Sequence, residues 1–480
     1  MRHNFYPQFI KDIISTGSGR LVNIISGFFV FLIIVRFIPK EQLAAFILIQ
    51  LIAYFFMVLS DLLVSDTAVI KLIISTEGKD KIKVVNTALG FKLLFGVFLS
   101  IIILLAKPFI LYLFQSRQLS QLFGYIPLYF LFFSFRPFFR EVLKGFYRYR
   151  EIGISEIIYG LLYLLFTVIL LIIFKKGVIG LVYAGFLSLT AMVTYQYLSI
   201  PFKKRIDFNF VLFRKIFRTG FLFGLDQFFI FVYEKTDKFM IGAMLSPIGL
   251  VYYEAASKIP KNSFQMYESF KNVFLPNMLN LFAQKKYREV TEVLNNSLRL
   301  ITLAAIFAAF ITLLFQEDIV RILFSQRYLA SAPVLPLLMF VLSFRFVQSI
   351  FRMLLIVLGQ SNKMLKLGII NAVANITGNF IMIPLFGFIG AAYAGIFSYI
   401  LTNLFSVRIL KKSGIDLQVS QYIKPILVFV ISAFLFLIIK PETVMVKLIL
   451  VVVFVLLCLL LSIIRKNDIF YLFESIKSSG

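Results

Sequence analysis

The sequence has few of the residues that build most catalytic and metal centres. Its 480 residues include one cysteine, Cys458, one histidine, His3, and no tryptophan. A single cysteine excludes a disulfide within the chain, and a single histidine excludes histidine-based triads and multi-histidine metal sites. No Gly-x-x-x-x-Gly-Lys-Ser/Thr loop is present, which argues against ATP-driven work. We therefore expect no cofactor, and only H⁺ or Na⁺ as a candidate coupling ion.

Charged residues are also scarce. They make up 15% of the chain, against 60% hydrophobic residues, and the mean hydropathy is +0.93. A soluble domain needs more polar surface than this. The segment 13–37 contains Arg20 and ends without a small-residue cleavage site, so it is expected to be a membrane span and not a signal peptide. The composition predicts an all-α, polytopic membrane protein.

Long apolar segments give the number of spans and their orientation. About 20 apolar residues are needed to cross the bilayer core. We expect fourteen spans, near residues 13–37, 42–66, 87–106, 119–136, 154–174, 178–200, 215–234, 247–273, 293–315, 331–357, 365–383, 387–407, 423–439 and 443–464.

Lysine and arginine are more than twice as numerous on the side that holds the two chain ends as on the opposite side. The positive-inside rule then places both termini in the cytoplasm. The basic loops are explained by this orientation and by contact with anionic lipid, so no nucleic acid partner is expected. No loop is long enough to form a catalytic domain.

One motif occurs twice in the chain. Residues 177–188 read GVIGLVYAGFLS and residues 387–398 read GFIGAAYAGIFS, with seven of twelve positions identical. Small residues let helices approach closely in lipid, so the motif predicts helix packing and not a ligand site. The copies lie six predicted spans apart, and this even number indicates a parallel repeat of two six-helix bundles. We expect domains at 1–200 and 201–412, followed by two additional helices and a cytoplasmic tail at 413–480.

Several basic residues fall inside the predicted spans, where a charge facing lipid is costly. Five of these are expected to line a cationic cleft between the bundles: Arg20, Lys258, Lys261, Arg345 and Arg352. Arginine presents a fork that binds phosphate through two hydrogen bonds, so an excess of such groups suits an anionic substrate.

Uncharged polar residues recur at helical spacing on the same predicted spans. The expected polar lining consists of Asn23, Gln50, Gln265, Gln348, Asn371, Asn375 and Asn379, and the span near 247–273 extends its polar stripe to Glu268 and Asn272. The acidic residues Asp61, Asp226 and Glu254 are candidate ion-coupling sites. The alternative for these acids is simple charge pairing, for example of Glu254 with Lys258 at a spacing of four, or of Asp61 or Asp226 with Arg20.

The layout resembles the polysaccharide-transporter branch of the multidrug/oligosaccharidyl-lipid/polysaccharide exporter superfamily, which includes bacterial O-antigen and capsule-unit flippases. The resemblance is carried by the fourteen spans, RFIPKEQLAAF (36–46), YEKTDKFMIGAMLSPIGLVYYEAASKIP (233–260), and the GLVYAG and GAAYAG segments of the repeat. The chain departs from the family pattern at Gln42, where a glycine is expected; the repeat partner of this position is Gly249.

The resemblance implies a flippase that moves undecaprenyl-diphosphate-linked oligosaccharide units across the bacterial inner membrane by alternating access, for O-antigen, lipopolysaccharide, capsule or exopolysaccharide biosynthesis. It implies contact with membrane lipids, with a polysaccharide polymerase and with chain-length proteins. Three alternatives stay open at this point: a lipid II flippase, a multidrug/cation antiporter, and a membrane oligosaccharide polymerase. Basic groups in the cleft weigh against the antiporter, and short outer loops weigh against the polymerase or any other enzyme.

Overall fold

The computed structural model describes residues 5–78, 80–202 and 204–464, with side chains from residue 15 onward except 266–269, 272, 273, 276 and 361. All regular elements in these ranges are helices, and no strand occurs among them. The all-α prediction is confirmed. Helices are the expected outcome because a helix bonds every backbone N–H and C=O within its own segment, as hydrocarbon requires.

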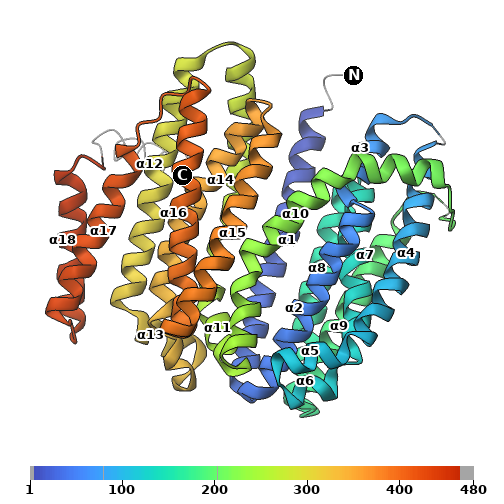
Figure 1. The fold of residues 1–480 in the computed structure, drawn as a ribbon, viewed down its shortest axis with the longest axis horizontal. Coiled ribbons are helices and arrows are strands. Elements are labelled where there is room, and N and C mark those ends of the chain that lie inside the picture. The colour runs from blue at the N-terminus through green and yellow to red at the C-terminus, as the bar shows by residue number, and fades with distance from the viewer. Residues whose placement is uncertain (1–4, 79, 203, 465–480) are drawn as a thin grey trace. The chain divides into compact units, whose positions relative to one another are not determined.

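The chain divides into two units, residues 1–251 and 252–480, each described here by itself. The first unit contains the following helices (Figure 1): α1 (Phe5–Phe37), α2 (Lys40–Leu63), α3 (Asp66–Ser75), α4 (Asp80–Leu105), α5 (Lys107–Phe114), α6 (Arg117–Leu122), α7 (Tyr125–Gly145), α8 (Tyr149–Thr167), a π-helical turn η1 (Val168–Ile173), α9 (Gly177–Leu198) and α10 (Phe210–Met244).

Helix α1 packs along α8, α8 along α9, and α2 contacts both α7 and α10.

The second unit begins in the second turn of α11. Its elements are α11 (Pro247–Ala283), α12 (Tyr287–Leu314), α13 (Gln316–Phe324), a 3₁₀ turn η2 (Gln326–Ser331), α14 (Val334–Val357), α15 (Ser361–Phe386), α16 (Phe388–Lys412), α17 (Ser420–Ile439) and α18 (Val444–Leu460). The helices α15 and α16 form an extensive hairpin, and α14 contacts both α12 and α16. The last pair packs against this group: α17 lies on α12, and Phe454 of α18 stacks on Phe310 of α12.

Eleven of the described helical segments are long and apolar enough to cross a bilayer. They match eleven of the fourteen predicted spans. The remaining three predictions correspond to α7, α11 and α18. Helix α18 has only 17 residues, whereas α7 and α11 each carry several charged residues. The multi-pass membrane fold is confirmed, and the count of fourteen is not.

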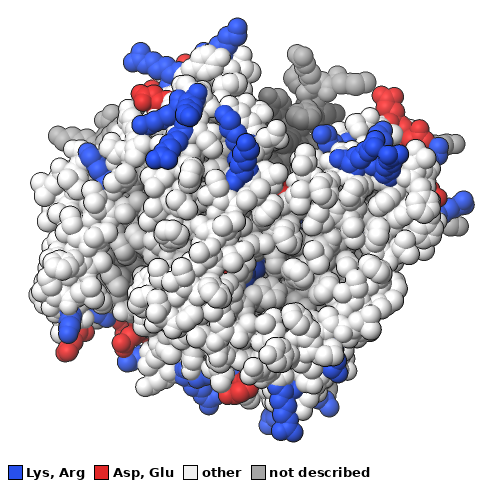
Figure 2. Space-filling view, in the orientation of Figure 1, with Lys and Arg blue, Asp and Glu red and all other residues white. Residues whose placement is uncertain are grey.

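Charged side chains gather at the helix ends in each unit. In Figure 2 the lysine and arginine residues lie at the two ends of the helices, and the belt between them is almost free of charge on the face shown. Large apolar side chains on the helices are exposed, for example Phe98, Leu165, Phe380 and Leu437, each at least half exposed. Such a surface is stable only against lipid.

The repeated motif starts a helix in each unit. Gly177 and Gly387 have left-handed backbones, with φ of +56° and +62°, a conformation that costs glycine little. Three residues later, a Cβ on Gly180 would lie 3.1 Å from the Leu170 carbonyl oxygen, and one on Gly390 would collide with the Met382 carbonyl oxygen. The repeat therefore sets a tight turn followed by close helix contact, as its small residues predict.

The connection between the halves is fixed to the first unit. The backbone N–H of Arg205 donates to Asn86 Oδ1 at 3.0 Å, and Thr87 Oγ1 donates to Asp207 Oδ2 at 3.2 Å. Beyond it, Phe213 of α10 stacks on Phe91 of α4 at 4.1 Å between ring centroids. These contacts place α10 with the first unit. The domain boundary at 200/201, drawn from the repeat, stays a prediction.

Candidate functional site

The polar stripe predicted in the eighth span lies on α11. Glu254 is 8% exposed, and its Oε1 lies 3.5 Å from Lys258 Nζ one turn later. Gln265 is half-buried and Lys261 is exposed. Glu254 and Lys258 thus form an ion pair. This is the charge pairing that the sequence offered as the alternative to an ion-coupling role for Glu254. The side chains of Glu268 and Asn272 lie outside the described residues.

Helix α14 brings a second cationic group to α11. The guanidinium carbon of Arg345 lies 3.7 Å from the ring centroid of Phe264, and Phe264 also stacks on Phe346 at 5.5 Å. Contact with an aromatic face is worth about 0.5–2 kcal/mol, depending on how dry the site is. Arg352 lies two turns further along α14 and is half-buried. The structure therefore brings Arg345 against α11, the helix that carries Lys258 and Lys261.

The predicted amide residues on α14 and α15 hydrogen-bond in pairs, one pair across the two helices and one within α15. Gln348, Asn371, Asn375 and Asn379 are all at most 3% exposed. Asn371 Nδ2 donates to Gln348 Oε1 at 3.3 Å, and Asn379 Nδ2 donates to Asn375 Oδ1 at 2.9 Å. Asn403 of α16 donates to the Phe344 carbonyl of α14 at 3.1 Å. Hydrogen bonds from side-chain amides to a neighbouring helix hold helices together in lipid.

Several of these asparagine and glutamine side chains have polar atoms without a hydrogen-bond partner among the described residues. Gln348 Nε2, Asn371 Oδ1, Asn379 Oδ1 and Asn403 Oδ1 are buried and have no hydrogen-bond partner among the described residues. A buried polar atom without a partner costs free energy, and such atoms are worth explaining individually. These atoms supply both a donor and acceptors within the second unit.

In the first unit, the predicted residue Asn23 belongs to a larger polar cluster. Asn23 Nδ2 donates to Glu156 Oε2 at 2.5 Å, and Arg136 Nη2 lies 2.9 Å from the same oxygen. The Arg136 guanidinium lies 4.8 Å from the ring centroid of Tyr159. This cluster joins α1, α7 and α8. Arg20, one turn before Asn23 on α1, has an exposed side chain.

Sequence reasoning missed the importance of Glu156 and Arg136. Arg136 lies at the edge of a predicted span, and Glu156 falls near the start of the next span. The position of Glu156 inside a predicted span was the available signal, because an acid within a span needs a partner such as Arg136.

The predicted coupling residue Asp61 lies where α2 ends and α3 begins. Its Oδ1 accepts the backbone N–H of Asp66 at 2.7 Å. Lys92 Nζ lies 2.8 Å from Asp66 Oδ1 and also donates to the Val64 carbonyl at 3.4 Å. Asp61 thus ties the α2–α3 joint together, and Lys92 fixes that joint to α4.

Two further predicted residues lie near α2. Gln50 is half-buried in the middle of α2, and Asp226 is half-buried on α10. Helix α10 approaches α2 closely at Gly224, where a Cβ would lie 2.9 Å from the Leu62 Cα and 3.2 Å from the Asp61 carbonyl oxygen. Asp226 follows two residues after this contact. The structure therefore brings the helices that carry Asp61 and Asp226 together within the first unit.

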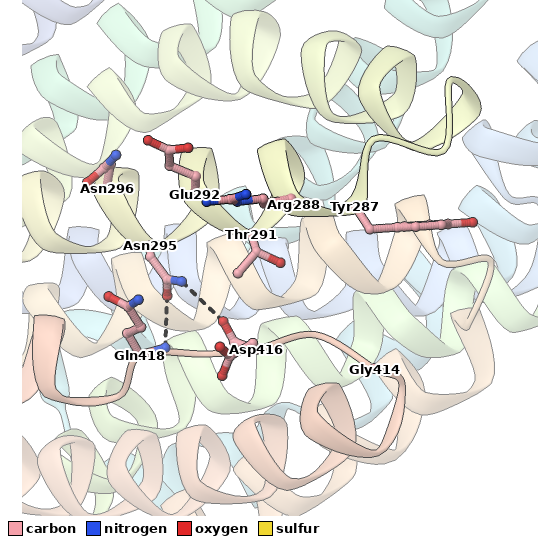
Figure 3. Close-up of a pocket in the computed structure, with 9 residues that line it drawn as sticks. All are labelled: Tyr287, Arg288, Thr291, Glu292, Asn295, Asn296, Gly414, Asp416 and Gln418. Carbon is pink, nitrogen blue, oxygen red and sulfur yellow. Dashed lines mark hydrogen bonds between the residues drawn. The ribbon is translucent and has the colours of Figure 1, made fainter.

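A polar pocket that the sequence did not predict lies in the second unit, with a volume of about 600 Å³. Figure 3 shows it between the first turns of α12 and the α16–α17 connection, lined by Tyr287, Arg288, Thr291, Glu292, Asn295, Asn296, Gly414, Asp416 and Gln418.

Asn295 holds the two walls together (Figure 3). Its Nδ2 donates to the Asp416 carbonyl at 3.1 Å, and its Oδ1 accepts the Gln418 N–H at 3.0 Å. The walls are about 120 positions apart in sequence, so only the tertiary structure brings them together.

These observations define the class of protein: an all-helical, multi-pass membrane protein that holds cationic and amide groups within its helices. Among the described residues, no group of three or more His, Cys, Asp and Glu side chains is placed to hold a metal ion.

Solved transporters share this fold. The lipid II flippase MurJ in an inward closed conformation superimposes with a TM-score of 0.71 at 17% identity, over 96% of this chain and all of that chain. An inward-facing multidrug resistance MATE family transporter of the MOP superfamily gives a TM-score of 0.66 at 15% identity, over 81% and 92% of the two chains. A MOP superfamily transporter from Pyrococcus furiosus gives 0.56 at 13% identity, over 84% and 95%. The chain has the fold of MOP superfamily transporters.

The family follows from sequence comparison. A model of the family described as polysaccharide biosynthesis protein matches residues 33–333, and the chain belongs to this family. An uncharacterized membrane protein of Methanocaldococcus jannaschii is 26% identical over 305 residues, which is 58% of this chain. The chain spans 57% of the length of that relative.

Proposed function

We propose that this protein is a flippase for lipid-linked oligosaccharides. It moves undecaprenyl-diphosphate-linked repeat units from the cytoplasmic to the outer leaflet of the bacterial inner membrane by alternating access. The product would feed O-antigen, lipopolysaccharide, capsule or exopolysaccharide synthesis, with a polymerase and chain-length proteins as later partners. Membership of the polysaccharide biosynthesis family and the MOP superfamily fold support this proposal.

The observation that carries the proposal is the position of Arg345. Its guanidinium is held against the Phe264 ring at 3.7 Å, on a helix whose neighbouring residues are largely buried and apolar. An aromatic face orients a guanidinium, whose N–H donors lie in the plane of the guanidinium itself. A diphosphate is the ligand that such a donor group suits, because its oxygens accept paired hydrogen bonds.

The other predicted residues complete the proposal. Arg20, Lys258, Lys261 and Arg352 would supply further positive charge to the diphosphate. Asn23, Gln50, Gln265, Gln348, Asn371, Asn375 and Asn379 would meet sugar hydroxyls during the transport cycle. Helices α17 and α18, whose outer faces are apolar and exposed, would lie beside the lipid tail. Asp61, Asp226 and Glu254 are the proposed sites of H⁺ or Na⁺ coupling, and both termini are proposed to be cytoplasmic.

The proposal is tested by reconstitution. The purified protein is placed in vesicles containing a fluorescent undecaprenyl-diphosphate oligosaccharide, and lipid that reaches the opposite leaflet is measured with a glycosidase added outside. Arg345→Gln and Arg352→Gln are expected to reduce the flipping rate at least about tenfold, since each removes charge-assisted hydrogen bonds to phosphate. Arg321→Gln is the matched control, because Arg321 is exposed and pairs with Glu317 at 3.1 Å on the short helix α13. Unchanged flipping in both α14 variants would refute the assignment.

A lipid II flippase is the second candidate, because the MurJ fold covers 96% of this chain. The same vesicles distinguish the two when they carry lipid II in place of the oligosaccharide lipid. We expect faster flipping of the oligosaccharide lipid. A multidrug antiporter would instead move a cationic dye against an imposed ion gradient, and we expect no such movement.

A further inference from the structure

A second pocket lies in the first unit. Its volume is about 320 Å³, and its polar lining consists of Gln42, Gln118, Gln121, Tyr125, Lys175 and Lys176. The lining residues come from the starts of α2, α7 and α9, from the residues just before α9, and from the short helix α6. By the charge distribution of the loops, this end of the unit faces the outer side of the membrane.

The lining of this pocket carries positive charge alone. Lys175 and Lys176 are exposed, and none of the lining residues is acidic. Lys175 adopts a left-handed backbone with φ of +50°, a conformation that strains a residue with a side chain. Glycine would occupy this position with less strain, yet the sequence has a lysine here.

Gln42 lies beside Gly177 in the same pocket. The position of a Cβ on Gly177 is 3.5 Å from Gln42 Oε1, so the Gln42 amide lies directly beside the turn that leads into α9. Three glutamines, Tyr125 and two lysines thus line one small pocket, and the Tyr125 hydroxyl also hydrogen-bonds the Tyr183 hydroxyl at 3.1 Å. Amides and hydroxyls both donate and accept hydrogen bonds, which suits a ligand rich in hydroxyl groups.

The repeat shows that helix packing does not require this lining. In the second copy, the residues before the motif are Leu385 and Phe386 in place of the two lysines, and Gly249 stands in place of Gln42. Gly387 nevertheless keeps the left-handed turn of Gly177. The scaffold is therefore common to both halves, whereas the basic, amide-rich lining belongs to the first half alone.

We propose that this pocket binds an acidic sugar of the transported glycan at the outer side of the membrane. The lysines would pair with the sugar carboxylate, and the glutamines would bond its hydroxyls. A volume of about 320 Å³ lies at the lower end of the range for small-molecule pockets, and so suits a single sugar ring. This inference rests on the proposed flippase function and adds a substrate class to it: glycans that contain a uronic acid.

The test uses the full-length protein in phosphatidylcholine nanodiscs and saturation-transfer NMR with sodium glucuronate as the probe. Glucuronate should bind, glucose should bind at least about tenfold more weakly, and added salt should weaken glucuronate binding. The double variant Lys175→Gln/Lys176→Gln should lose at least about tenfold in affinity, and Gln42→Gly should lose a smaller part. Lys440→Gln is the matched control, because Lys440 is an exposed lysine that also has a left-handed backbone, with φ of +46°.

Several results would overturn the inference. Equal binding of glucuronate by the wild type and the double variant would place the site elsewhere, and equal binding of glucose would remove the role of charge. Binding of glycerol 3-phosphate or dihexanoyl phosphatidylglycerol without binding of glucuronate would make the pocket a lipid headgroup site. None of these results affects the vesicle assay on Arg345 and Arg352, so failure of the pocket and failure of the flippase are distinguishable.

Discussion

Lys92 and Asp66 form an ion pair in the interior of the first unit. Lys92 Nζ lies 2.8 Å from Asp66 Oδ1, and the lysine side chain has no exposed surface. Lys92 also lies over the Phe138 ring at 5.9 Å and donates to the Val64 carbonyl. One lysine thus holds together α4, the α2–α3 joint and α7. It satisfies the requirement that a charge within a span has a partner.

Removing one partner of this pair should be far more costly than removing an exposed pair. Lys92→Met is expected to lower the free energy of unfolding by about 3–5 kcal/mol, because it leaves the Asp66 carboxylate buried without its counter-charge. Lys83→Met is the control on the same helix: Lys83 lies 2.8 Å from Asp80, but both side chains are more than 60% exposed. Exposed pairs contribute about 0–1 kcal/mol. The measurement is unfolding of each variant in detergent, and equal losses would contradict the structural role of Lys92.

Replacing a tightly packed glycine should affect stability differently from replacing a glycine with open space around it. Gly390→Ala should destabilise the α15–α16 hairpin, because the new methyl group would collide with the Met382 carbonyl oxygen, and the backbone there has little freedom to shift. Gly27→Ala is the control within α1, since no atom lies within 4 Å of its Cβ position. Alanine is favoured over glycine in a helix interior by about 0.5–1 kcal/mol. The melting temperature should therefore fall for Gly390→Ala and stay level or rise for Gly27→Ala; a fall of similar size in both would show that close packing is not the cause.

Arg299 connects two distant parts of the second unit. Its Nη1 donates to the Ile463 carbonyl at 2.6 Å, and the residue is 2% exposed. Arg299→Gln should loosen the end of α18 and speed proteolysis around residues 461–464, since a charged donor at a helix C-terminus stabilises the unpaired carbonyls. Lys424→Gln removes an exposed bond to the Leu461 carbonyl at 3.2 Å and should have the smaller effect. Cleavage rates in detergent decide this, and a larger effect of Lys424→Gln would contradict the prediction.

Replacing Asn295 should change amide hydrogen exchange in the α16–α17 connection. Asn295→Ala should speed exchange of the Gln418 amide, because that N–H donates to Asn295 Oδ1. Asn296→Ala changes a neighbouring pocket residue without removing this acceptor, so the Gln418 amide should remain protected. The readout is amide exchange followed by mass spectrometry of the 414–418 segment. Identical exchange in the two variants would show that Asn295 does not fix the connection.

The positions of the spans were predictable because long apolar segments leave few choices in a membrane. The predicted spans near 178–200 and 387–407 agree closely with α9 and α16. The short helices α3, α5, α6 and α13 were not predicted, because segments of 6–10 residues are too short to show a helical period. Helix α7 carries more charge than a span usually tolerates, and Glu156 on α8 explains how one of these charges, Arg136, is accommodated.

The candidate site was predictable in kind and less so in detail. Polar spacing along single helices identified Glu254 with Lys258, and the ladder of Asn371, Asn375 and Asn379. Spacing along one helix carries no information on which other helix a residue meets. The contacts of Arg345 with Phe264 and of Lys92 with Asp66 join different helices, so they could not be predicted from this spacing.

The sequence by itself determined the class of the protein and the positions of eleven of its spans, because apolar length acts locally along the chain. Only the tertiary structure decided which charges neutralise one another, which amides meet, and where pockets open. Those properties depend on side chains that lie far apart in sequence and adjacent in space. Gln42 illustrates the difference. In the sequence it is a departure from a family pattern, whereas in the tertiary structure it lies beside Gly177, in a pocket with Lys175 and Lys176.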